Sequence, residues 1–128
     1  MSNNGGLITE EDLSGYYSKL RDPIIFNYKN LKIASMPPPS SGGLLLGLML
    51  NMLENFDLSD EPNDVKNILI ISEIMQIAFS LRAKHIGDED FYSVPIENFL
   101  SDDIAAELSK NVNTKRTSKN SEINNANI

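Results

Sequence analysis

The sequence contains no cysteine, no tryptophan and a single histidine, His85. The lack of cysteine excludes disulfide bonds, thiolate nucleophiles and cysteine metal sites. His85 stands near the predicted end of a helix, where an imidazole is most simply a favourable partner for the helix dipole. We therefore expect neither a metal site nor a cofactor.

Long hydrophobic runs are missing as well. The longest apolar run, Leu44–Leu50, stops at Asn51 and is far shorter than the ~20 residues that cross a bilayer. The first residues, Met1–Leu13, have neither the basic nor the apolar region of a secretory signal. We expect no membrane span, and the chain as given reads as soluble, unprocessed and cytoplasmic.

Positive charge is scarce in most of the chain. The formal net charge is −7, from 11 Lys and Arg against 18 Asp and Glu. The last sixteen residues carry three basic side chains and one acidic side chain, which leaves −9 for residues 1–112. An acidic body repels phosphate backbones, so nucleic acid is not an expected partner. The length allows one domain with one core.

The periodicity predicts an α+β fold that is mostly helical, with a short β-hairpin. Two β-favouring runs predict strands at Ile24–Tyr28 and Leu31–Ser35. Two long helices are predicted at about Leu44–Phe56 and Asp64–Ile86, each apolar on nearly every side except for a narrow polar stripe, which in the second helix includes Glu73. Because such helices belong inside a sizeable body, the sequence looks like part of something larger.

Capping residues predict two shorter helices, and composition predicts a tail. Thr9 precedes three acidic residues and is expected to cap a helix that runs to about Tyr17. Ser101 is expected to cap a last helix. The final residues are rich in Asn and show no apolar period. We therefore divide the chain into a partial domain, residues 1–112, and a disordered polar tail, residues 113–128.

The most informative stretch is SMPPPSSGG, which joins the second strand to the first long helix; its last seven residues are called the signature segment here. Proline cannot donate ladder hydrogen bonds, so the three prolines must end the strand. One of the two serines is expected to cap the helix, and the two glycines let it start close to its neighbours. The signature segment comprises Pro37, Pro38, Pro39, Ser40, Ser41, Gly42 and Gly43.

Other chemistry for these residues is less favoured. The start of a helix can bind an anion through free N–H groups. A phosphate-binding loop would also need a lysine, and none occurs between Lys32 and Lys66. No base is placed to activate the serines. The acidic stretch Gly87–Phe91 lacks the ligand spacing of a calcium loop, so we interpret it as a solvated loop.

Several motifs together closely resemble gamma-glutamyltranspeptidases, also called glutathione hydrolases. The family's Gly-Gly-x-Leu-Thr-x-x-Asp-Leu start is similar to Gly5–Leu13, and its Arg-Glu-Pro segment is similar to Arg21–Pro23. The family's Ser-Met-Pro-Pro-Pro-Ser-Ser-Gly-Gly motif is present intact at Ser35–Gly43. The later stretch Glu73–Pro95 is similar to the family's helix and its Gly-Asp-Pro-Asp-Phe loop, although the loop's proline is replaced by Glu89.

The resemblance implies a fold and a chemistry. The implied fold is the αββα sandwich of an N-terminal-nucleophile hydrolase, of which this chain would be a fragment. In that family a precursor cuts itself into a large and a small subunit and exposes a threonine, which attacks the gamma-glutamyl carbonyl of glutathione or related compounds. Members of the family are often exported from the cell.

The resemblance covers only the end of the large subunit, so it assigns no catalytic and no substrate-binding residue here. The family's nucleophile lies in a Thr-Thr-His-x-Ser segment, whereas no histidine follows His85 in this sequence. The signature segment corresponds to a structural part of the enzyme. We expect the chain to be inactive alone and to assemble with the missing large-subunit part and the small subunit. The alternative is a non-catalytic helical binding module that has kept the family scaffold.

Overall fold

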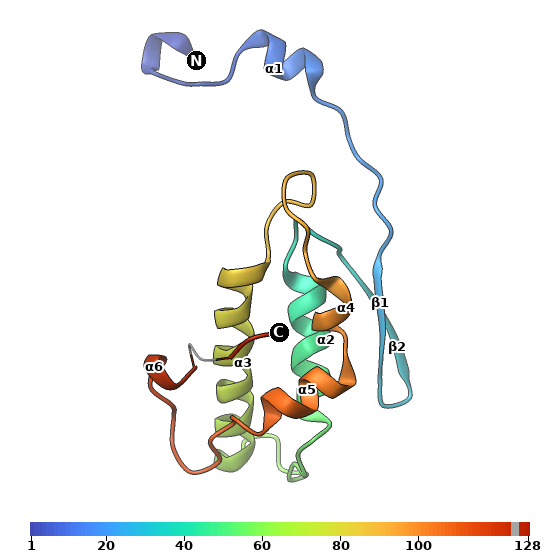
Figure 1. The fold of residues 1–128 in the computed structure, drawn as a ribbon, viewed down its shortest axis with the longest axis vertical. Helices are drawn as coiled ribbons and strands as arrows, with labels where there is room; N and C mark the ends of the chain where they lie inside the picture. The colour runs from blue at the N-terminus through green and yellow to red at the C-terminus, as the bar shows by residue number, and fades with distance from the viewer. Residues whose placement is uncertain (124–125) are drawn as a thin grey trace.

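The computed structural model describes residues 1–123 and 126–128, without the side chains of Ser2, Asn120 and Ser121. Helices α2 and α3 lie side by side, the β-hairpin lies beyond α2, α4 and α5 pack against α2, and α6 lies beside α3 (Figure 1). This is the mostly helical α+β arrangement that the sequence predicts. The elements in chain order are η1 (Ser2–Asn4), α1 (Glu10–Gly15), β1 (Ile24–Tyr28), β2 (Leu31–Ser35), α2 (Gly42–Leu53), α3 (Val65–His85), α4 (Ile96–Phe99), α5 (Asp102–Ser109) and α6 (Asn120–Ile123).

The hairpin has the two strands that the sequence predicts, with the same bounds. The strands are antiparallel, with Ile24 opposite Ser35 and Tyr28 opposite Leu31. Lys29 has a φ of 53° in the connecting turn, and its N–H donates to a carboxylate oxygen of Glu54 at 2.8 Å. Alternate residues of β1 are buried, so one face of the hairpin packs against α2.

The core lies between α2, α3 and the segment that holds α4 and α5. Its side chains are almost fully excluded from solvent, and burying each of them contributes about 1.5 to 3 kcal/mol to folding. Because α2 contacts the hairpin, α3, α4 and α5, it is the central element of the fold. The largest apolar side chains of this core are Leu44, Leu48, Met52, Ile70, Ile74, Ile77, Leu81 and Phe99.

The ends of the two long helices follow from side-chain hydrogen bonds. Helix α3 begins after Asp64, whose carboxylate accepts from the N–H of Lys66 at 2.7 Å. Helix α2 ends at Leu53, three residues before the predicted end at Phe56. The side-chain amide of Asn55 donates to two carbonyl oxygens of the last turn, so the helix does not continue.

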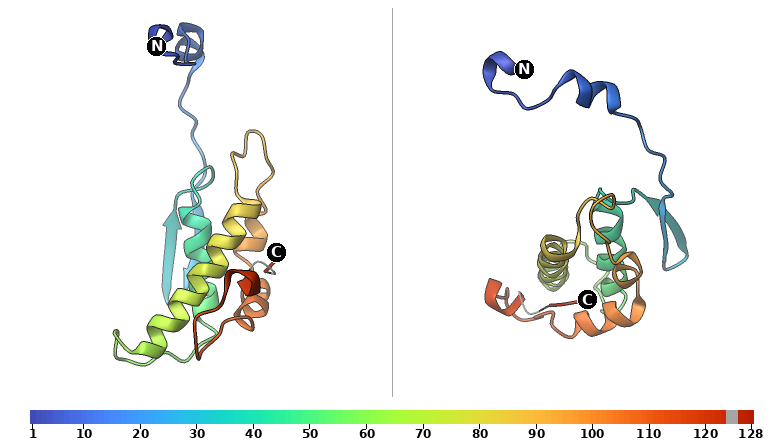
Figure 2. Two further views of the ribbon diagram at one scale, coloured as in Figure 1. Left: turned by 90° about the vertical axis from the view of Figure 1, so that its left-hand side faces the viewer. Right: turned by 45° about the horizontal axis from the view of Figure 1, so that its top comes forward.

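Residues 1–23, called the arm here, extend away from the helices in every view (Figure 2). Helix α1 starts with the predicted cap, in which Thr9 and Asp12 exchange hydrogen bonds of 2.8 and 3.1 Å. None of the six residues of α1 is buried. Large apolar side chains along the arm are therefore exposed to solvent, namely Leu7, Ile8, Leu13, Tyr16, Tyr17 and Leu20.

The tail contributes to the core in this structure. Helix α6 lies beside α3, and Ile123 and Ala126 are buried. These apolar residues are isolated within an Asn-rich segment, so periodicity does not reveal them. The domain boundary at residue 112 stays a prediction. Among the residues that the structure describes, no helix is both long and apolar enough to span a membrane.

Candidate functional site

The signature segment forms the tight connection between β2 and α2. Strand β2 ends at Ser35, just before the prolines. The N–H of Ser40 donates to the carbonyl oxygen of Pro37 at 3.1 Å, which closes a turn. Pro38 is fully buried, whereas Pro39 is exposed. The segment thus has one side in the core and one side at the surface.

The two serines have different partners. The hydroxyl oxygen of Ser40 accepts a hydrogen bond of 3.3 Å from the N–H of Gly42, the first residue of α2. Ser41 is the residue that precedes the helix, but its side chain makes no capping hydrogen bond. Instead its Oγ accepts from Nε of Arg82 on α3 at 2.9 Å. Ser41 therefore links the signature segment to the neighbouring helix.

The two glycines also differ. A Cβ atom at Gly43 would lie 2.3 Å from the backbone oxygen of Met36, which is closer than such atoms ever approach. A Cβ atom at Gly42 would meet only the Ser40 hydroxyl, at 3.5 Å. Gly43 is therefore the position where a side chain is excluded, because the start of α2 lies against the end of the strand.

The polar stripe of α2 faces other parts of the fold. A Cβ atom at Gly47 would lie 2.6 Å from Cδ2 of Leu100, so α2 and the segment after α4 are in close contact. The amide of Asn51 donates to the Leu100 carbonyl oxygen at 3.2 Å and to the Asp102 carboxylate at 3.1 Å. The stripe therefore fixes the C-terminal helices on α2.

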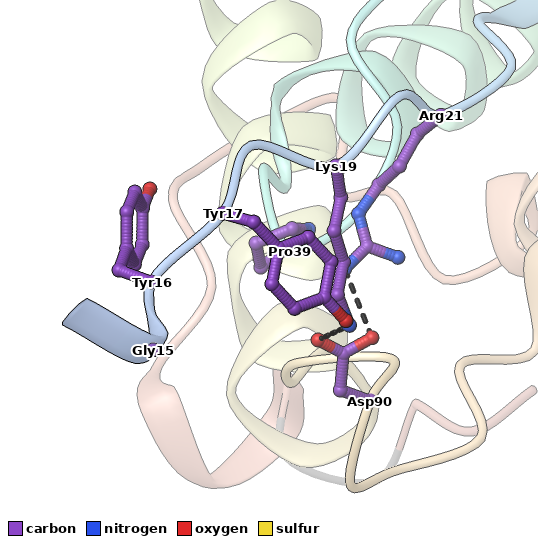
Figure 3. Close-up of a pocket in the computed structure, with 7 residues that line it drawn as sticks. All are labelled: Gly15, Tyr16, Tyr17, Lys19, Arg21, Pro39 and Asp90. Carbon is purple, nitrogen blue, oxygen red and sulfur yellow. Dashed lines mark hydrogen bonds and ion pairs between the residues drawn. The ribbon is translucent and has the colours of Figure 1, made fainter. Parts of the chain in front are cut away.

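A second cluster, called the arm clamp here, joins the arm to the acidic loop after α3. Nζ of Lys19 donates to one carboxylate oxygen of Asp90 at 2.5 Å, and Nη2 of Arg21 donates to the other at 3.1 Å (Figure 3). Arg21 also lies 3.9 Å from Asp88 and 3.6 Å from Glu89. The loop is therefore ion-paired with the arm.

The arm clamp borders an open pocket of about 420 Å³ next to the signature segment. The hydrogen bond from Lys19, and after it the one from Arg21, lowers the pKa of Asp90 below its ordinary value. The same bond raises the pKa of Lys19. Since each charge faces an opposite charge, the cluster suits a structural role. The pocket is lined by Gly15, Tyr16, Tyr17, Lys19, Arg21, Pro39 and Asp90.

Over residues 1–123 and 126–128, no group of three His, Asp or Glu side chains is arranged to hold a metal ion. The acidic loop, which the sequence analysis interprets as a solvated loop, is ion-paired with Lys19 and Arg21.

Sequence reasoning missed two of these contacts and did not reveal the burial of one residue. It did not pair Lys19 with Asp90, although two basic residues in the arm and three consecutive acidic residues after α3 were the available signal. It did not pair Ser41 with Arg82. It placed Glu73 on a polar stripe, whereas this side chain is only 1% exposed because the tail covers it.

Comparison with solved structures gives the class of the protein. The chain is similar to the gamma-glutamyltranspeptidase of Helicobacter pylori, with a TM-score of 0.88 and 40% identity over 94% of this chain and 35% of that one. It is also similar to the enzyme from Pseudomonas nitroreducens complexed with L-DON, with a TM-score of 0.88 and 31% identity over 96% of this chain and 38% of that one. The fold is therefore that of a region of N-terminal-nucleophile hydrolases.

Sequence comparison gives the family. The glutathione hydrolase proenzyme of Escherichia coli (strain K12) is 36% identical over 124 residues, which make up 96% of this chain and 21% of the relative. The gamma-glutamyltranspeptidase family profile matches residues 1–127, and the chain belongs to this family. It spans about one fifth of the length of the curated relatives that it matches.

Proposed function

We propose that this chain is the signature-bearing part of the large subunit of a gamma-glutamyltranspeptidase. The whole enzyme would transfer or hydrolyse the gamma-glutamyl group of glutathione or related compounds through an N-terminal threonine. The observation that carries the proposal is the match to the Helicobacter pylori enzyme, which extends over 94% of this chain at a TM-score of 0.88. No residue of this chain is assigned to the chemical step.

An open apolar face supports a role within a larger enzyme. A groove of about 160 Å³ lies between α2 and α3, and its exposed lining is almost entirely apolar. Leu46 is 38% exposed and Met75 is 45% exposed, although both belong to helices that form the core. Such a patch, together with the uncovered arm, fits a chain that buries these surfaces against further protein. The groove is lined by Leu46, Met49, Leu50, Leu53, Ile71, Ile74 and Met75.

In this proposal the signature segment has a structural role. Gly43 lets α2 begin directly against the end of β2, and Ser41 joins that point to α3 through Arg82. The arm clamp then sets the direction in which the arm leaves the hairpin. The chain would contribute the helical layer formed by α2 and α3. The remaining large-subunit part and the small subunit would supply the groups that bind and attack the substrate.

The second candidate is a non-catalytic helical binding module. It is favoured by the polar groups of the core, because no buried side-chain nitrogen or oxygen among the described residues lacks a hydrogen-bond partner. A well-satisfied core is what a chain that folds alone requires. A monomeric size and well-dispersed amide signals for the isolated chain would favour this candidate.

A domain-replacement experiment tests the first proposal. The matching region of the Escherichia coli proenzyme, which is 36% identical, is replaced by residues 1–128. We expect the chimaera to release product from a gamma-glutamyl anilide, and the isolated chain to release none. The same chimaera with Gly43→Val is the control and should lose activity. Turnover by the isolated chain, or a folded chimaera without any activity, would count against the proposal.

A further inference from the structure

Glu73 is a buried carboxylate whose hydrogen-bond donors come mainly from the tail. It lies within α3 and is 1% exposed. Its Oε1 accepts from the N–H of Ser118 at 2.7 Å, and its Oε2 accepts from the hydroxyl of Ser118 at 2.5 Å. The N–H of Asn113 lies 3.4 Å from Oε2. On the same helix, the amide of Gln76 donates to Oε1 at 3.4 Å.

These contacts make the burial of Glu73 depend on the tail. A buried carboxylate without donors is strongly unfavourable, because it loses its hydration without compensation. Hydrogen bonds to an ionised group are shorter and stronger than those between neutral groups. Arg116 is close enough to Glu73 for a weak electrostatic effect, but its ion pair is with Glu122 at 2.8 Å. Ser118 is thus the principal partner of the Glu73 carboxylate.

Further contacts continue along the same face of α3. Ile77 lines a cavity of about 60 Å³ together with Ile123 and Ala126. At the penultimate residue of the helix, Nζ of Lys84 donates to the Ala126 carbonyl oxygen at 2.8 Å. Residues 73, 77 and 84 share one helix face because their spacing follows the helical repeat. This face has a polar anchor at each end and an apolar middle.

We propose that this face of α3 is a docking surface for the chain's own tail, and that the Glu73 carboxylate is the group that recognises it. The tail is too polar to dock by apolar contact alone, since the apolar side chains that its described residues bury are those of Ile123 and Ala126. Its docking therefore depends on the charged hydrogen bonds to Glu73. The chain then has two states, one with the tail docked on α3 and one with the tail released. The docking of the tail does not depend on the proposed enzymatic function.

Hydrogen exchange of the full 128-residue chain tests the proposal. We expect the Ser118 amide to be protected in the wild type. Glu73→Gln replaces an ionised acceptor by a neutral group whose NH2 competes with the donors of Ser118. A charged hydrogen bond of about 1.5 to 3 kcal/mol corresponds to roughly 10- to 150-fold in an opening equilibrium. We therefore expect exchange at Ser118 to accelerate by at least about tenfold in this variant.

Two further variants make the result decisive. Glu107→Gln removes the same charge from an exposed side chain of α5 that pairs with Lys110. It should leave the rate of hydrogen exchange at Ser118 unchanged. Ser118→Ala keeps Glu73 and removes only the hydroxyl, so exchange over 113–123 should rise severalfold even if Glu73→Gln does not fold. Wild-type exchange of this segment at the rate of an unstructured chain would overturn the proposal. So would equal rates in Glu73→Gln and Glu107→Gln, or an unchanged rate in Ser118→Ala.

Discussion

Nε of Arg82 donates a hydrogen bond of 2.9 Å to Oγ of Ser41, which joins α3 to the signature segment across 41 positions of sequence. Ser41 directly precedes α2, at the position where a serine ordinarily bonds to the helix backbone. Here the Ser41 hydroxyl bonds instead to Arg82 on the neighbouring helix α3. The two long helices are therefore held in register at one end by a side-chain contact in addition to their apolar packing.

Loss of this contact should be measurable as a loss of stability. We expect Ser41→Ala to lower the free energy of unfolding by about 1 kcal/mol, the usual contribution of such a hydrogen bond. Urea denaturation followed by circular dichroism measures it. Ser14→Ala in the exposed helix α1 is the control, and should change stability by less than about 0.5 kcal/mol. Equal effects of the two substitutions would contradict the role given to Ser41.

The two glycines of the signature segment should respond differently to an added methyl group. We expect Gly43→Ala to destabilise the fold by about 2 to 3 kcal/mol, since the new Cβ atom forces the start of α2 away from the strand. In Gly42→Ala the new Cβ atom makes only an ordinary contact with the Ser40 hydroxyl, at 3.5 Å, so the substitution should be neutral or stabilising by up to about 1 kcal/mol, because alanine favours the helix. Chemical denaturation of both variants compares them, and a neutral Gly43→Ala would show that the close approach to Met36 is absent.

The arm clamp should control how accessible the arm is to proteases. Asp90→Asn removes the charge that Lys19 and Arg21 share, so we expect trypsin to cleave after these two residues several times faster. The melting temperature should change little, because the clamp lies at the surface. Asp60→Asn, an exposed substitution outside the clamp, should leave the cleavage rate unchanged. Cleavage of Asp90→Asn at the wild-type rate would mean that the ion pairs do not hold the arm.

The tail should lose order at acid pH. The hydrogen bonds from Arg116, and after them the one from the Lys119 backbone, lower the pKa of Glu122 from 4.5 to about 2. A lowered pKa in the folded state stabilises the fold above the unfolded value of 4.5, and this stabilisation is lost as pH falls toward 2. An NMR titration of the Glu122 carboxyl measures the shift. Arg116→Gln should return the pKa toward 4.5, and a wild-type value near 4.5 would contradict the ion pair.

Local sequence signals predicted the elements of the fold well. The hairpin strands were predicted with their observed bounds, because Pro23 and the three prolines limit them on both sides. The caps at Thr9 and Ser101 were predicted because a capping residue acts within three positions of itself. The family was recognised from the signature segment, and the profile match confirms it.

Contacts between distant residues were not predictable in the same way. Lys19 and Asp90 are 71 positions apart, and Ser118 lies 45 positions from Glu73. No periodic pattern relates such pairs, since their meeting depends on how the helices pack. The sequence therefore predicted that Glu73 belongs to the polar stripe of α3. It could not show that a polar segment of the tail covers this residue.

The arm also has a mechanical consequence. It leaves the hairpin at Pro23 and is steadied at Lys19 and Arg21, while α1 lies far beyond these points (Figure 2). The acidic loop and this part of the arm are therefore tied together at Asp90, so a spectroscopic probe attached beside Lys19 would report movements of the acidic loop.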